Sequence, residues 1–201
     1  VVPSGIQLGV GVKLSAVYRI MQQGNIASTG NTYDVAIQGK GLLAVELPNE
    51  DAAYTRAGSL QLSPEGQIVT TDGYPVQPGI TVPQDAIGVT INSSGEVLAT
   101  IAGQIVPTNV GQLTLVSFAN EGGLEAMGDN LFVETAASGA AIEGTPGQDG
   151  FGTILQGYVE TSNVNSVEEI TNLITAQRAY EMLAKVIQTS DEMSATTSQL
   201  S

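Results

Sequence analysis

The stretch LQLSPEGQIVTTDG, residues 60–73, decides the fold class of this 201-residue chain. Leu60 and Leu62 alternate with a polar residue and run into Pro64-Glu65-Gly66, which is a turn sequence. The β-branched run at 68–71 then leads directly to Asp72-Gly73. Because Asp-Gly readily adopts the positive φ angles of a two-residue hairpin, the stretch predicts short antiparallel strands joined by tight turns.

The same pattern recurs from residue 24 to residue 160. Apolar residues alternate at 43–47 and 97–101, and turn residues such as Gly95 precede or follow them. Further strands are predicted at 112–118 and 131–134, whereas 137–152, with five glycines, is expected to form a long loop or a β-excursion. Turn signals at this regular spacing predict an all-β domain of antiparallel hairpins over residues 24–160.

The two ends of the chain differ from this block. Residues 1–23 combine glycines with alternating apolar residues, which predicts an extended arm or an edge strand. Residues 161–201 have neither Gly nor Pro after Ser166, and Ser166-Val167-Glu168-Glu169 has the form of a capping box. The overall prediction is a mainly β protein with one long, coiled-coil-like C-terminal α-helix.

The predicted helix carries apolar residues on more than one side. Val167, Ile170, Leu173 and Ile174 fall on one stripe at helical spacing, and Tyr180, Leu183, Ala184 and Ile187 continue it, while Met182, Val186 and Met193 lie elsewhere. A helix that is apolar on two sides needs neighbours on both, and no other segment of this chain is a helical partner. Isolated, so long a helix is expected to be marginal.

Composition excludes several classes of function. The chain has 20 acidic and 6 basic residues, a net charge of −14, and neither Cys nor His. Disulfides, Cys or His zinc sites and Ser-His-Asp triads are therefore excluded. Phosphate backbones and anionic lipids attract clusters of Lys and Arg, which this chain lacks, and no apolar run is long enough for a membrane span. We therefore expect neither nucleic-acid binding nor direct membrane insertion.

Catalytic motifs are also missing. The Gly-x-Gly pairs lack the third glycine of a dinucleotide fingerprint, and no Gly-x-Ser-x-Gly elbow occurs. Asp149-Gly150 lacks the flanking carboxylates of a calcium loop. Glu168 and Glu169 are adjacent and diverge on a helix, where the first turn favours acidic residues. The sequence predicts no enzyme, no metal and no cofactor.

Read as a whole, the chain resembles the flagellar rod and hook family. The similarity runs in order along nearly the whole chain, in QGN (23–25), TGN (29–31), DVAIQGKG (34–41), YTRAGSL (54–60), GYPVQ (73–77), GYVETSNVN (157–165) and AQRAYE (176–181). Residues 2–9 and 79–83 favour the distal part of the rod over the proximal part, which remains an alternative. Hook proteins carry a large extra outer domain for which this chain has no room. By this resemblance, we expect the chain to lack the family's N-terminal helix, which would be the partner that the C-terminal helix needs, together with the loop that joins it to the arm at Val1.

The resemblance implies a structural subunit rather than an enzyme. Helices from many subunits would form concentric tubes around an export channel, in a helical homo-oligomer that transmits torque. The neighbours would be proximal rod proteins, hook protein, and the peptidoglycan-ring and outer-membrane-ring proteins of the basal body in the periplasm, reached by type III export. The subunit interface would comprise Val167, Ile170, Leu173, Ile174, Gln177, Arg178, Tyr180, Glu181, Leu183, Ala184 and Ile187.

Two questions stay open at this level. Gln177, Arg178 and Glu181 either bond between helices or form a solvated face with a local Arg178–Glu181 pair. Arg56 is expected to pair with a carboxylate of the same subunit or of another one. The structural motif residues are Arg56, Gly58, Gly66, Asp72, Gly73 and Gly95. The rival function is a secreted β-rich binding or adhesin module with a helical stalk.

Overall fold

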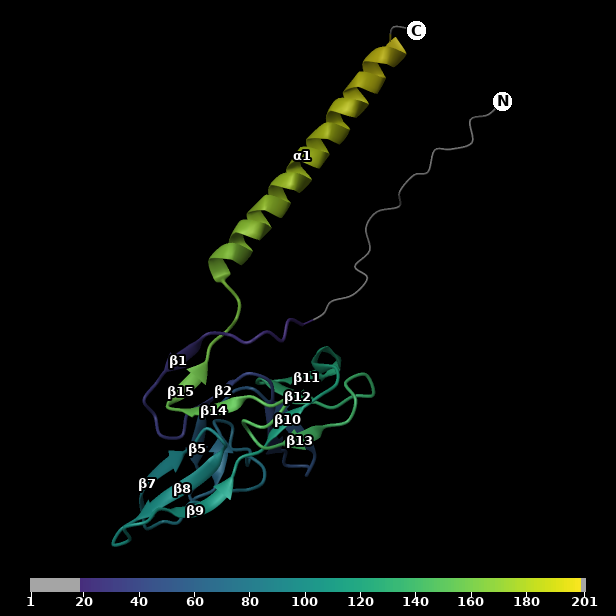
Figure 1. The fold of residues 1–201 in the computed structure, drawn as a ribbon. Helices are drawn as coiled ribbons and strands as arrows, with labels where there is room; N and C mark the ends of the chain where they lie inside the picture. The colour runs from purple at the N-terminus through teal and green to yellow at the C-terminus, as the bar shows by residue number, and fades with distance from the viewer. Residues whose placement is uncertain (1–18, 200–201) are drawn as a thin grey trace. The chain divides into compact units, whose positions relative to one another are not determined.

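The structure, a computed structural model, describes residues 19–199 (Figure 1). It consists of two compact units, one up to Glu160 and the other from Thr161 onward. The first unit contains antiparallel β-sheets and the second contains one helix. The predicted fold class, mainly β with a long C-terminal helix, is confirmed. Most of the predicted arm lies outside the described residues.

The β unit contains one large sheet and several smaller ones. The six-stranded sheet has the order β11-β12-β4-β3-β10-β13. Its strands are β11 (Glu125–Gly128), β12 (Leu131–Val133), β4 (Ala52–Thr55), β3 (Leu42–Glu46), β10 (Leu115–Ser117) and β13 (Ile142–Gly144). A 3-10 turn, η1 (Glu121–Gly123), precedes β11. The expected β-excursion within 137–152 is therefore β13, an edge strand of this sheet.

The remaining strands form four smaller sheets, one of which lies where the chain leaves the unit. A three-stranded sheet has the order β7-β8-β9, with strands Ala86–Ile91, Glu96–Ile101 and Thr108–Gln112 (Figure 1). Three antiparallel pairs complete the unit: β5 (Leu60–Leu62) with β6 (Ile68–Thr70), β2 (Val35–Gln38) with β14 (Thr153–Gln156), and β1 (Ile26–Ser28) with β15 (Tyr158–Glu160).

Strand β3 is buried on both faces and separates two cores. Leu43 and Val45, both fully buried, belong to a large cluster that also includes Val97 and Leu113. Leu42 and its alternate neighbours pack on the other face, in a smaller cluster where Tyr54 and Phe118 meet edge to face at 4.8 Å. Successive side chains of a strand point to opposite faces. The adjacent residues Leu42 and Leu43 therefore belong to different cores.

Three hairpins share one turn geometry, which corrects the turn expected at Asp72-Gly73. Thr70 N–H donates to Tyr74 O (2.9 Å) and Gly73 N–H to Thr70 O (3.0 Å), so the loop is 71–73, with three residues. Gly73 has a positive φ of 88°, whereas Asp72 does not. The Thr70 hydroxyl also accepts the Tyr74 N–H at 3.2 Å, which stabilises the longer loop. This is a type I turn followed by a left-handed glycine.

The other predicted turn glycines have specific backbone roles. Gly66 and Gly95 occupy the same left-handed position in their hairpins, each with φ 83°. A Cβ on Gly66 would lie 2.5 Å from Val82 O. Gly58 is buried where its carbonyl accepts the Val35 N–H at 2.8 Å, and a Cβ there would overlap the Val35 backbone. A fourth turn of this type, at 48–50, places a non-glycine residue, Glu50, at φ 66°.

The second unit is helix α1 (Ser166–Gln199), 34 residues long. The capping box expected from Ser166 is wrong: Asn165 is the N-cap, because its side-chain oxygen accepts the Val167 N–H at 3.1 Å. The Asn165 carbonyl accepts the Glu169 N–H at 3.0 Å, the first bond of the helix. Ser166 is therefore already helical. Within residues 19–199, no helix combines the length and the apolarity needed to cross a membrane.

Candidate functional site

Helix α1 exposes an unusual number of apolar side chains. Every side chain from 161 to 190 is exposed. Val167 has 73% of its surface exposed, Tyr180 70% and Ile174 45%. The other large apolar residues exposed on the helix are Ile170, Leu173, Met182, Leu183, Val186, Ile187 and Met193. Exposed apolar side chains in this number are typical of surfaces that bind other proteins.

The polar residues predicted on the same helix are also exposed. Gln177, Arg178 and Glu181 all project from α1 into solvent, as does the small residue Ala184. Arg178 and Glu181 both lie in the described part of the chain, and they form no ion pair with each other there. All the predicted interface residues therefore lie on one helix that offers them no intramolecular partner among the contacts described.

A second cluster fixes the point where the chain enters and leaves the β unit. Arg56 follows β4, and its Nε donates to Glu160 Oε2 at 2.7 Å. The two side chains are 22% and 12% exposed, respectively. The rest of the guanidinium donates to three backbone carbonyls: Gly41 O at 2.9 Å, Ile37 O at 3.1 Å and Gly39 O at 2.7 Å. The carboxylate expected for Arg56 thus belongs to the same chain.

Glu160 extends this cluster to the incoming chain. Its other oxygen, Oε1, accepts the Gly24 N–H at 2.7 Å. The neighbouring Gln23 donates to Ile37 O at 2.9 Å and accepts the Gly39 N–H at 3.1 Å. We call Arg56, Glu160, Gln23 and Gly24 the exit clamp. Because Glu160 is the last residue of the β unit, the clamp holds both connections to the rest of the chain against rigid backbone.

Segments that carry the family resemblance in the sequence lie at this exit. Asp34, 8% exposed, accepts hydrogen bonds from the side chains of Thr29 (2.6 Å) and Asn31 (3.1 Å). Its carbonyl accepts the Gly157 N–H at 2.8 Å. Gln156 links the exit to the three-stranded sheet, since its amide donates to Val89 O at 3.0 Å. Sequence reasoning missed Glu160, Gly24 and Gln156, although two of them lie in family segments: Gly24 in QGN and Glu160 in GYVETSNVN.

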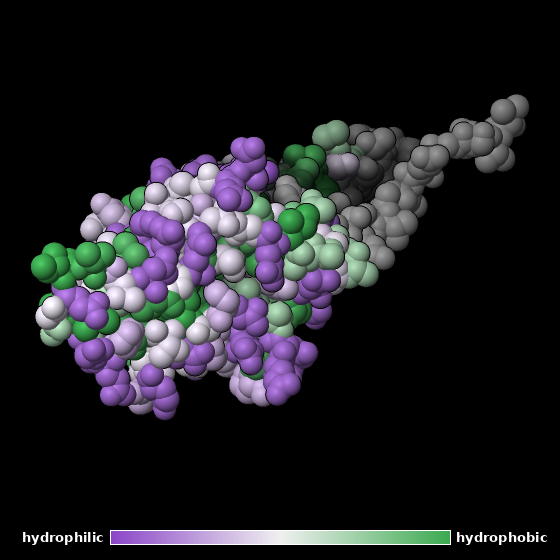
Figure 2. All heavy atoms as spheres, turned by 60° about the horizontal axis from the view of Figure 1, so that its bottom comes forward, coloured by the Kyte–Doolittle hydropathy of each residue, from purple (hydrophilic) through white to green (hydrophobic). Residues whose placement is uncertain are grey.

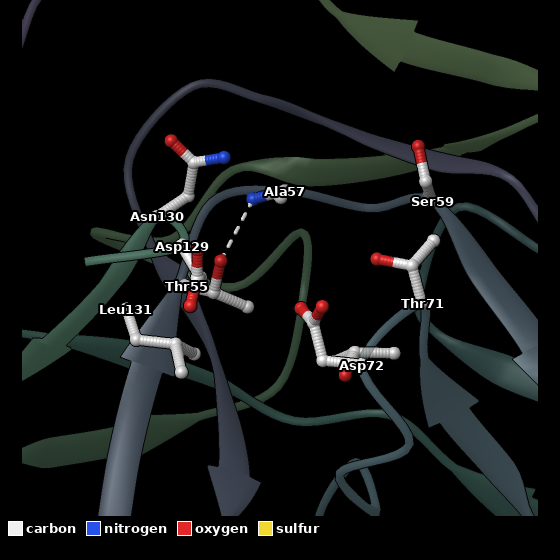
Figure 3. A pocket seen from close by; sticks show the side chains of 9 residues that line it. Thr55, Ala57, Ser59, Thr71, Asp72, Asp129, Asn130 and Leu131 are labelled. Atoms are coloured by element: carbon white, nitrogen blue, oxygen red, sulfur yellow. Dashed lines mark hydrogen bonds between the residues drawn. The ribbon is translucent and has the colours of Figure 1, made fainter. Parts of the chain in front are cut away.

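One hollow of the described surface is small and polar. The hollow, about 220 Å³, is lined by Asp72 and Asp129 with Thr55, Ser59, Thr70 and Thr71, and by Ala57, Asn130 and Leu131. Figure 3 shows the Asp72 carboxylate pointing between Thr55 and Thr71. Small-molecule pockets usually measure about 300–1,000 Å³ and are largely apolar, so this hollow fits that class poorly. Across residues 19–199, no three His, Cys, Asp or Glu side chains converge as metal ligands.

A β unit with a clamped exit, together with a long exposed helix, is typical of a structural protein that assembles with others. Residues 36–99 match the family model for the flagellar hook protein FlgE/F/G D1 domain. Residues 155–200 match the model for the C-terminal part of the flagellar basal body rod FlgEFG proteins. Both segments include the structural elements described above.

Individual relatives agree with these matches. The flagellar basal-body rod protein FlgG of Caulobacter vibrioides is 58% identical over 200 residues, which cover 100% of this chain and 76% of that protein. FlgG of Bacillus subtilis is 37% identical, with 93% and 72% covered, and the flagellar hook-basal body complex protein FlhP of the same organism is 33% identical, with 95% and 73% covered. The chain belongs to the flagellar basal-body rod protein family. It is a structural component of the flagellar basal body, as the resemblance implied.

Proposed function

We propose that the chain is a subunit of the distal rod, a helical periplasmic polymer that transmits torque to the hook and surrounds the export channel. The observation that carries the proposal is helix α1, which exposes apolar residues on all sides in a chain similar to FlgG proteins. Identical subunits joined head to tail form an open helix when the rotation between them does not close. The residue divisions 24–160 and 161–201 then correspond to an outer β domain and an inner packing helix.

Packing of α1 against neighbouring subunits supplies the assembly energy in this proposal. Burying one large apolar side chain contributes about 1.5–3 kcal/mol. Val167, Ile174 and Ile187, with their exposed neighbours on the helix, could together contribute on the order of 10 kcal/mol or more per subunit. Association costs an estimated 4–15 kcal/mol, so most of this surface must be buried for the polymer to be stable.

The exit clamp fixes the point at which the chain leaves the β domain. Torque carried by packed helices reaches the β domain through residues 161–165, directly after Glu160. Arg56 ties Glu160 to the backbone of 37–41, so that force is spread over several strands. This role requires rigidity and no catalysis, and we propose that the protein is not an enzyme.

The charge of the β unit suits rotation inside a ring. Residues 19–160 contain 15 acidic and 3 basic residues, a net charge of −12. A strongly acidic outer face stays hydrated and resists adhesion to an enclosing protein. We propose that this face turns inside the peptidoglycan and outer-membrane rings, between proximal rod and hook proteins.

Substitutions on α1 test the assembly role. Ile174→Asp or Ile187→Asp places a charge on the packing surface and should abolish hooks and swimming, because an unpaired buried charge costs several kcal/mol. Ile174→Ala, which keeps the helix and loses only part of the apolar surface, serves as the matched control and should be less severe. Thermal unfolding of the β unit should not change. Normal rods in the Asp variants, or a melted β unit, would contradict the proposal.

A further inference from the structure

Charge is distributed very unevenly over the β unit. Of the 18 charged residues among 19–160, only Glu96 falls within residues 86–120, which contain the sheet β7-β8-β9. The other 17 lie elsewhere in the sequence of the unit, and one of them, Asp85, lies beside the β8–β9 loop, where its carbonyl accepts the Ala102 N–H at 3.5 Å. When strongly acidic copies approach one another, an uncharged surface is where contact costs least.

The tip of this sheet projects apolar side chains into solvent. In the β8–β9 loop, residues 102–107, Ile105 is 100% exposed and Val106 74%. Figure 2 shows hydrophobic side chains protruding at the end of the β unit where this loop lies in Figure 1. The loop is anchored by the Gln104 N–H, which donates to Ile101 O at 3.1 Å. An anchored loop loses less conformational freedom when it binds.

Elsewhere on the β unit lies a hollow, which is concave where the β8–β9 tip is convex. It measures about 490 Å³ and lies between the hairpin turn at 48–50 and the turn at 71–73. Leu47, Pro48, Tyr74 and Pro75 provide its apolar lining. Carboxylates of Glu46, Glu50 and Asp72 complete the lining, with Glu50 and Asp72 both exposed. Ile105 is fully exposed and therefore does not fill the hollow of its own chain.

We propose that the β8–β9 tip of one copy inserts into the 46–50/72–75 hollow of the next copy in the rod. The inference rests on the proposed function and adds a contact between β domains to the contact between helices. Every copy carries both the tip and the hollow, and a projection that fits a pocket elsewhere on the same molecule makes a head-to-tail contact that propagates. Residues 102–107 bring no charge to a hollow lined by three carboxylates, so β units that each carry a net charge of −12 can meet there.

Charge substitutions at Ile105 provide the test, made in cells that produce the whole protein. Ile105→Glu should prevent rod completion and hook formation, because a carboxylate would enter a site lined by Glu46, Glu50 and Asp72. Ile105→Lys should assemble, because an ammonium would pair with those groups. The double variant Ile105→Glu, Glu50→Lys should regain hooks lost in the single variant.

Two controls make each outcome decisive. Met127→Glu places a charge on an exposed apolar residue far from the tip in sequence, in β11, and should leave the number of hooks per cell unchanged. Purified Ile105 variants should unfold at the temperature of the unaltered protein, since Ile105 has no buried surface. Equal loss from Glu and Lys, or no rescue by Glu50→Lys, would overturn the assignment of the hollow. Hooks that form normally with Ile105→Glu but do not rotate would assign the tip to a different basal-body protein. If Ile174→Asp stops assembly and Ile105→Glu does not, the proposed function stands and this inference fails.

Discussion

Removal of Arg56 tests the exit clamp most directly. The Arg56 guanidinium donates to Glu160 and to the carbonyls of Gly41, Ile37 and Gly39 at 2.7–3.1 Å. Arg56→Ala leaves the Glu160 carboxylate, 12% exposed, without its cation, and removes the donor from three carbonyls. We expect the β unit to lose a large part of its stability.

The magnitude follows from burial. Removing one partner of a fully buried pair costs about 3–5 kcal/mol. Because the Arg56 side chain is 22% exposed and water screens part of the interaction, we expect about 2–4 kcal/mol for Arg56→Ala. Arg56→Lys keeps the charge but loses the planar fork, and should cost about 1–2 kcal/mol. Glu160→Gln keeps the shape and loses the charge, with a similar cost of about 1–2 kcal/mol.

Urea unfolding followed by circular dichroism measures these costs. A double-mutant cycle with Arg56→Ala and Glu160→Ala should give a coupling energy of about 1.5–3 kcal/mol. Arg19→Ala is the matched control, because Arg19 is exposed and lies 5.0 Å from the centre of the Phe132 ring; its loss should cost about 0.5–1 kcal/mol. A cost for Arg56→Ala no larger than that of Arg19→Ala, or a coupling energy near zero, would refute the clamp.

Four further outcomes are expected. Glu50→Gly should stabilise the β unit by about 0.5–1 kcal/mol in urea unfolding, because φ 66° strains a residue with a Cβ; an unchanged or lower stability would contradict this. Burial, together with nearby carboxylates, raises the pKa of Tyr54. The stability that this shift contributes is fully present below the unfolded pKa of about 10 and is lost as pH rises through the higher folded pKa. Tyr54→Phe should therefore flatten the loss of stability at alkaline pH, and an equally steep loss in the variant would exclude Tyr54 as its cause. Amide hydrogens of 166–199 should exchange quickly in dilute monomer and slowly in assembled rods, since the helix has no packing partner of its own; strong protection in the monomer would count against this. Limited proteolysis of the monomer should leave 24–160 intact, and cleavage throughout that block would rule out an autonomous β domain.

Local sequence signals determined the elements and the class of this protein. Alternating apolar residues and turn glycines such as Gly66, Gly73 and Gly95 predict hairpins because strand period and positive φ are properties of a few adjacent residues. The stretch after Ser166 predicts a helix because it lacks Gly and Pro and repeats apolar residues at helical spacing. The family segments indicate the rod family without reference to any tertiary contact.

The tertiary structure alone decided which distant residues meet. Arg56 and Glu160 are separated by 104 positions in the chain, and no periodicity connects them. The sheet pairing determines that Leu42 and Leu43 enter different cores, and the hydrogen bonds of Thr70 and Asn165 decide the length of a turn and the start of the helix. Exposure is likewise tertiary: Val97 and Ile105 are both β-branched apolar residues, yet Val97 is fully buried and Ile105 fully exposed. Hydrophobicity is a property of the residue, whereas burial depends on what the rest of the chain places over it.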